Sequence, residues 1–199
     1  VTVPGAPKAW AELNKRFGRL SLSEDLAPAV RYAREGYPCS PNLALMWQRA
    51  YNRYTKAFDG KPEFDEWFKT FTPDGKPYEA GDIIKLPNHA DTLEAIGRTG
   101  ADAFYSGDKK KKIDADSREF GGYLRYEDLA KFEAKWVEPI KVNYRGYEVC
   151  EIPPNGQGIV ALMALNILKE FDFTEKDCVE TYHKQLEAIK MAFADAFHY

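Results

Sequence analysis

The sequence predicts a helix-rich α+β chain with one β-hairpin at about residues 139–152. Apolar residues recur at helical spacing along most of its length. Strong apolar–polar alternation occurs in one place only, over Ile140–Asn143 and Tyr147–Ile152, with Tyr144-Arg145-Gly146 between the two runs. No apolar run approaches the length of about 18 residues that a membrane-spanning helix needs, so we expect no span in this chain.

The first helix is expected over residues 6–17, where Gly18 ends it. Its apolar residues are spaced so that Trp10, Leu13 and Phe17 share a face, which we expect to point inward. A loop is expected at 71–87, because Pro and Gly interrupt this stretch repeatedly. Further helices are expected at residues 22–35, 41–58, 92–98, 101–105 and 126–132.

Ser21 and Glu24 fit a capping box at the start of the second of these helices, and Gly36 closes it. Pro28 is expected to kink this helix or to occupy its first turn, since proline cannot donate the usual backbone hydrogen bond.

Two helices are expected after the hairpin. Residues 159–171 are apolar nearly all round, which predicts a helix buried on most sides. The last helix follows Asp177, which we expect to cap it together with Glu180. One stripe of this helix carries Tyr182, Leu186, Ile189, Phe193 and Phe197.

Composition excludes several classes of protein. The 199 residues carry 28 Lys and Arg against 31 Asp and Glu, and this net charge of −3 argues against general nucleic-acid binding. Three widely spaced cysteines are too few for a disulfide framework or a zinc ribbon. The chain begins at Val1 and stops at Tyr199 inside a helical pattern. We therefore expect residues 1–199 to form a single partial domain of a longer protein.

The reactive residue types give no convincing catalytic set. The three cysteines are expected to be small buried hydrophobes. Cys178 lies at a helix start, which lowers a thiol pKa, but we expect the neighbouring Asp177 and Glu180 to raise that pKa instead. His183 and Glu187 share a helix face and are interpreted as polar surface, since two ligands do not make a metal site. We expect no metal and no cofactor.

Two further clusters have ordinary interpretations. The run Lys109–Lys112 is expected to be solvated surface, because nearby aspartates cancel most of its field. An aromatic stripe is expected to serve packing rather than sugar stacking. Its members are Trp47, Tyr51, Tyr54 and Phe58.

The most unusual local element is Pro153-Pro154-Asn155-Gly156-Gln157-Gly158, which follows a strand and opens a helix. Backbone N–H groups at such a helix start can hold a carboxylate or an oxyanion. The same sequence is also compatible with an ordinary turn before a buried helix. From the residues alone both interpretations remain open.

Several stretches, in order along the whole chain, resemble the γ-glutamyltransferase (γ-glutamyltranspeptidase) family. The match is collinear, although each motif alone is weak. The stretches include Val3-Pro4-Gly5-Ala6, Phe17-Gly18-Arg19-Leu20, residues 26–38, residues 71–77, residues 100–107, Gly121-Gly122-Tyr123-Leu124, Tyr144-Arg145-Gly146-Tyr147, residues 153–158 and Phe193-Ala194-Asp195.

The resemblance implies an N-terminal nucleophile (Ntn) hydrolase with an αββα sandwich, to which this chain contributes a helix-rich segment of the large subunit. It implies a zymogen that cleaves itself and a small subunit whose new N-terminal Thr attacks γ-glutamyl donors such as glutathione. That Thr would lie beyond Tyr199, so no catalytic residue is assigned to this chain, which alone should be inactive. The substrate-binding candidates are Asn155, Gly156, Gln157 and Gly158. The compartment stays open, because many members are periplasmic or secreted and others are not.

Three departures from the family pattern favour a divergent relative, one of which is the four-lysine run Lys109–Lys112. Asn-Gly-Gln replaces the family's usual Ser-rich or Gly-Gly loop, and Ala196 stands where an Arg usually follows Ala-Asp. One alternative is therefore an acylase of the same fold that acts on β-lactam side chains or other amides. Another is a non-catalytic module in which an exposed apolar helix, Ile159–Phe171, docks a partner.

Overall fold

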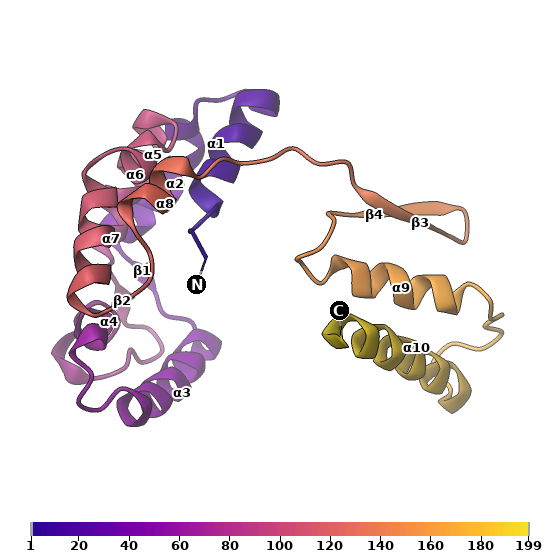
Figure 1. Cartoon of the computed structure of the whole chain (residues 1–199). Coiled ribbons are helices and arrows are strands. Elements are labelled where there is room, and N and C mark those ends of the chain that lie inside the picture. The colour runs from indigo at the N-terminus through magenta and orange to yellow at the C-terminus, as the bar shows by residue number, and fades with distance from the viewer. Residues whose placement is uncertain (1, 199) are drawn as a thin grey trace. The chain divides into compact units, whose positions relative to one another are not determined.

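The computed structural model describes residues 2–198, which form two compact units that divide between Ala134 and Lys135 (Figure 1). In the part of the chain that is described, no helix has the length and apolarity needed to cross a bilayer. The first unit contains α1 (Ala6–Phe17), α2 (Leu22–Glu35), β1 (Tyr37–Pro38), α3 (Pro41–Ala57), η1 (Pro62–Phe64), α4 (Asp65–Phe71), η2 (Pro73–Gly75), β2 (Ile83–Ile84), α5 (Pro87–Thr99), α6 (Asp102–Tyr105), α7 (Asp108–Glu119) and α8 (Tyr126–Lys131). The second contains β3 (Ile140–Tyr144), β4 (Tyr147–Glu151), α9 (Gly158–Leu168) and α10 (Val179–His198).

The capping box predicted for α2 is confirmed. The Ser21 hydroxyl accepts a hydrogen bond from the Glu24 backbone N–H at 3.3 Å, and the Glu24 carboxylate accepts one from the Ser21 N–H at 2.8 Å. The helix continues through Pro28, which lies in its interior and not in its first turn. Gly36 ends α2 with a φ of 101°, and an added Cβ there would meet the Ile83 side chain. A glycine is therefore needed where the chain turns into the short antiparallel pair β1–β2.

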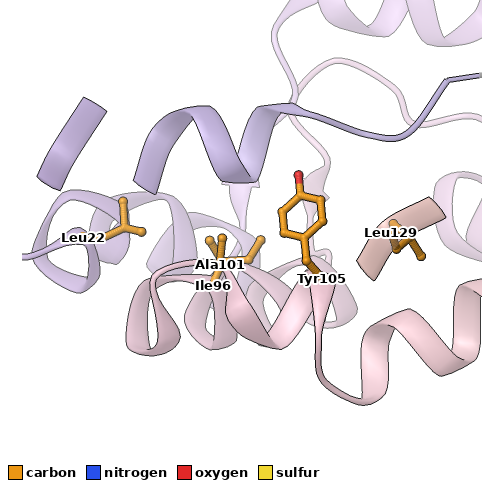
Figure 2. Close-up of a cluster of buried hydrophobic side chains, with 5 residues drawn as sticks. All are labelled: Leu22, Ile96, Ala101, Tyr105 and Leu129. Carbon is orange, nitrogen blue, oxygen red and sulfur yellow. The ribbon is translucent and has the colours of Figure 1, made fainter. Parts of the chain in front are cut away.

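The core of the first unit joins α2, α5, α6 and α8. Its buried members are Leu22, Ile96, Ala101, Tyr105 and Leu129 (Figure 2). The Tyr105 hydroxyl donates a hydrogen bond to the Pro4 carbonyl at 2.5 Å, which ties the segment before α1 to this core. Gly97 of α5 faces the Ser23 backbone so closely that an added Cβ would lie 3.0 Å from the Ser23 Cα. The small residue therefore lets α2 and α5 pack closely.

The inward orientation expected for the apolar face of α1 is wrong. Trp10, Leu13 and Phe17 are 40%, 50% and 65% exposed, whereas the buried residue of α1 is Pro7 and Ala11 packs against the core. Small residues allow α1 to approach the core closely, and the large apolar side chains lie on another face. Amphipathic spacing identified the helix correctly but not the face that this unit buries.

The lysine run is helical and only partly solvated, which corrects the expectation of a solvated surface run. Lys109–Lys112 lie in α7, and Lys110 is 3% exposed with its Nζ 3.4 Å from the centre of the Tyr126 ring. A cation over an aromatic face is stabilised by the ring quadrupole, so the buried charge has a favourable partner. Asp114 strengthens the same α7–α8 contact by accepting a hydrogen bond from the Tyr126 N–H at 2.9 Å.

The aromatic stripe of α3 packs against the segment that follows it, as expected. The Trp47 ring lies 6.0 Å from that of Phe71 and 5.1 Å from that of Tyr78. Tyr54 contacts Trp67, with ring centres 4.8 Å apart. The expected loop at 71–87 also contains η2 and the short strand β2. The helix expected at 92–98 begins earlier, at Pro87, because proline is well suited to a first helical turn.

The predicted hairpin is confirmed in the second unit. Tyr144 pairs with Tyr147, and the two connecting residues, Arg145 and Gly146, have φ values of 53° and 88°. Two left-handed residues match the twist of antiparallel strands. Helix α9 packs against both strands and against α10, and it buries Val160, Leu162, Ala164 and Leu168.

The cap predicted for α10 is wrong. Asp177 has a φ of 59° and its carboxylate accepts a hydrogen bond from the Tyr182 hydroxyl at 2.7 Å, while Glu180 pairs with Lys184 at 2.7 Å. The Thr181 N–H instead meets the sulfur of Cys178 at 3.5 Å. The sulfur therefore occupies the place expected for a capping oxygen.

Leu129 is fully buried, so replacing it with Ala is expected to lower the free energy of unfolding by about 2–5 kcal/mol. Leu20→Ala is the control, because Leu20 is 56% exposed and its truncation should change stability by about 0.5 kcal/mol or less. Urea denaturation of the two variants measures the difference. Equal unfolding midpoints would contradict the position of this core.

Candidate functional site

The loop singled out by the sequence borders a hollow of about 600 Å³ in the second unit. The loop leaves β4, turns at residues 154–157 and starts α9 at Gly158. The other wall is the C-terminal part of α10. The lining residues are Pro154, Asn155, Gly156, Gln157, Ile159, Val160, Met163, Phe193, Asp195, Ala196 and Phe197.

The hollow combines apolar walls with a few polar groups. Met163, Phe193 and Phe197 are among its apolar lining residues, and Asn155 and Gln157 of the loop bring amide side chains. Its volume and mixed lining are typical of sites for small organic molecules, in which apolar contacts provide affinity and a few polar groups fix orientation. Amide side chains both donate and accept hydrogen bonds, so they suit a neutral amide ligand.

A carboxylate of the chain itself lies beside the start of α9. A Cβ added to Gly158 would lie 2.8 Å from the Glu151 carboxyl carbon and 2.9 Å from the Glu151 Cβ. The end of β4 and the start of α9 therefore touch through a glycine. A negative charge near a helix N-terminus interacts favourably with the helix dipole. An incoming anion at Gly158 would meet this negative charge.

Of the four predicted substrate-binding residues, the structure places Asn155, Gly156 and Gln157 on the hollow and Gly158 at the contact with Glu151. Sequence reasoning missed the opposite wall. Phe193 and Phe197 were noticed as part of an apolar stripe, but nothing in their spacing showed that they face the loop. Only the packing of α10 against α9 brings them together.

The cysteines differ from one another more than expected. Cys39 is buried, and this burial raises its thiol pKa, whereas Cys150 is exposed on β4, contrary to expectation. The expected rise in the pKa of Cys178 is also wrong. The Thr181 hydroxyl, 3.4 Å from the sulfur, and the Thr181 N–H hold the pKa of Cys178 below its ordinary value. The charge of Glu180 opposes this, but more weakly.

No general base activates Cys178 among these contacts. Its sulfur lies near the Thr181 hydroxyl and the Glu175 carbonyl, and neither accepts a proton near neutral pH. His183 and Glu187 lie on the polar side of α10, where Glu187 pairs with Lys190 at 2.6 Å. Within residues 2–198, His, Cys, Asp and Glu form no group of three that could hold a metal ion.

The whole chain, residues 1–199, matches the gamma-glutamyltranspeptidase family. The chain belongs to this family. A solved cephalosporin acylase from Bacillus halodurans is 52% identical, with a TM-score of 0.95 over 100% of this chain and 37% of that one. The match confirms the family, and with it the Ntn fold class, that the resemblance implied. The structure confirms the helix-rich α+β character.

Two curated relatives carry names of both kinds, one for glutathione hydrolysis and one for acylase activity. The glutathione hydrolase-like YwrD proenzyme of Bacillus subtilis (strain 168) is 35% identical over 98% of this chain and 36% of its own length. The acylase ACY 1 proenzyme of Pseudomonas sp. (strain SE83) is 34% identical over 98% of this chain and 34% of its own length. The chain therefore spans about a third of the length of these two relatives.

The structure gives little support to the interaction-module alternative. Helix α9 is not bare, because the hairpin and α10 cover much of it and four of its residues are buried. The apolar side chains of this helix thus pack within the second unit and do not form a free docking surface.

Gly158→Ala is expected to destabilise the chain, because the new methyl group would overlap the stem of Glu151. We expect a loss of about 1–3 kcal/mol in the free energy of unfolding, typical of overpacking. Gly156→Ala is the matched control, since an added Cβ at Gly156 meets no atom within 4 Å. Thermal or urea unfolding of both variants checks the result. A larger loss for Gly156→Ala would contradict the described geometry.

Proposed function

We propose that the whole protein hydrolyses or transfers γ-glutamyl groups, and that these 199 residues form part of its large subunit. The observation that carries the proposal is the family match along residues 1–199. In this mechanism an N-terminal Thr, outside this chain, attacks the amide carbonyl and releases the amine. Water or a second amine then breaks the resulting ester.

The partner in this proposal is the small subunit of the same precursor, freed by self-cleavage. The relatives named as proenzymes support this, since such a name denotes a precursor form. Residues 1–199 would then be a single partial domain, completed by the remaining polypeptide. Both units of the chain serve as supporting structure in this scheme, and the reacting groups come from elsewhere.

We further propose that Asn155–Gly158 bind the substrate. The amides of Asn155 and Gln157 would hold its polar groups, and the apolar wall of the hollow would hold its carbon skeleton. The glycine at position 156 leaves open space beside the loop, so a ligand could approach the backbone there.

A second candidate function is that of an amide acylase, and two observations favour it. Identity to the Bacillus halodurans cephalosporin acylase is 52%, against 35% to the glutathione hydrolase-like proenzyme. The predominantly apolar wall of the hollow also suits a donor that lacks the α-amino group of glutamate.

The full-length processed protein is expected to release the aniline from a γ-glutamyl anilide, whereas the 199-residue chain alone should release none. The same assay with a glutaryl anilide separates the two candidates, because the glutaryl donor lacks the α-amino group. Faster release from the glutaryl compound favours the acylase. Release from neither substrate by fully processed protein would contradict both candidate functions.

Gln157→Ala in the full-length enzyme is expected to raise KM about 2- to 10-fold with little change in kcat. One lost hydrogen bond contributes about 0.5–1.5 kcal/mol, and it would be lost equally from substrate and transition state. Asn166→Ala is the control, since Asn166 is an exposed amide of α9 outside the hollow. Steady-state kinetics measures both. An unchanged KM for Gln157→Ala would contradict the proposal that this loop binds the substrate.

A further inference from the structure

Helix α10 has three chemically distinct faces. One is made of small residues, Thr181, Ala188 and Ala192, which are buried. Ala192 belongs to the same core cluster as Val160 and Ala164 of α9, so this face is the contact between the two helices. Small residues on both sides let the helix axes lie close together.

The second face carries charged side chains that pair with one another. Glu180 pairs with Lys184 at 2.7 Å, and Glu187 pairs with Lys190 at 2.6 Å. Pairs of this i,i+3 and i,i+4 kind add little stability to a helix, and the Lys184 side chain of the first pair is only 25% exposed.

The third face is apolar and exposed, and we call it the α10 stripe. Tyr182 is 49% exposed, Leu186 60%, Ile189 41% and Phe197 78%, and Phe193, which is partly buried against the α9–α10 cluster, completes the row. These five residues follow one another at intervals of three and four, so they form a continuous band along the helix. An uninterrupted apolar band of this kind is typical of a contact surface, whereas single exposed apolar residues are common.

The stripe runs directly into the proposed substrate site. Its last two aromatic residues, Phe193 and Phe197, line the hollow beside Asn155 and Gln157. Their rings are stacked with centres 5.5 Å apart. A body that covers the stripe would therefore also form a rim of the hollow and help to enclose the ligand.

We propose that the α10 stripe is the surface on which the remaining polypeptide of the same precursor packs. This inference rests on the proposed function, in which that polypeptide carries the nucleophile. The relatives and the solved acylase are nearly three times as long as the stretch that matches this chain, so most of their polypeptide lies outside it. A surface of the same precursor is present at a high effective concentration, which favours it over a second copy or a separate protein.

Cysteine labelling of the full-length processed protein tests the proposal. Leu186→Cys places a thiol on the stripe and Glu187→Cys places one on the charged face, one residue away. In the 199-residue chain these side chains have similar exposure, since Leu186 is 60% and the Glu187 side chain 46% exposed. We expect iodoacetamide to label position 186 at least about tenfold more slowly than position 187, because a covered thiol reacts only through local opening. Peptide mass analysis separates these positions from the three native cysteines.

Equal labelling rates at the two positions would overturn the proposal. Protection that disappears when the protein is diluted would overturn it too, because it would identify a second copy as the covering body. Hydroxyl-radical footprinting of the unsubstituted protein gives the same comparison if Leu186→Cys does not fold. In that case Tyr182 and Phe197 should be oxidised at least about tenfold more slowly than in the denatured protein. The anilide assay measures activity and the labelling measures whether the stripe is covered. An inactive protein could therefore still show the expected protection of position 186.

Discussion

The burial of α9 is the constraint on which the arrangement of the second unit depends. Its residues are apolar on nearly every side, and water would be in contact with most of them if the helix stood alone. The hairpin covers one side and α10 covers another. With both in place, the loop before α9 and the C-terminal part of α10 line the same hollow. The hollow is a geometric consequence of covering one very apolar helix with two partners.

The charge at the start of α9 affects which part of a ligand this hollow can hold. The carboxylate of Glu151 lies beside Gly158, where the N-terminus of the helix would otherwise attract an anion. A donor carboxylate would be repelled there, whereas a neutral amide or a carbon chain would not. The start of α9 therefore suits an uncharged portion of a ligand better than a carboxylate.

Local signals in the sequence predicted local structure well. The capping box of Ser21 and Glu24 and the alternation around Tyr144 are set by neighbours in the chain, and both are confirmed. Lys110 shows where such reasoning fails. Its neighbours in the sequence are charged, but in the folded chain its ammonium group lies over the ring of Tyr126. Cys178 is similar, because its hydrogen bonds with Thr181 lower the thiol pKa by more than the nearby charge of Glu180 raises it.

The candidate site was predictable only on the side formed by one continuous segment. Asn155–Gly158 were recognisable because Pro and Gly between a strand and a helix mark a local turn. Phe193 and Phe197 are far along the chain, and their pattern shows that they share a face without showing what that face meets. The same ambiguity applies to Trp10 and Leu13 of α1, which share an apolar face that the first unit leaves exposed. Periodicity measures how strongly a helix prefers to bury one side, but the body that buries it is determined by the rest of the fold. For α10, the buried face is the one with the smallest side chains, so the larger apolar area is still available for a second contact.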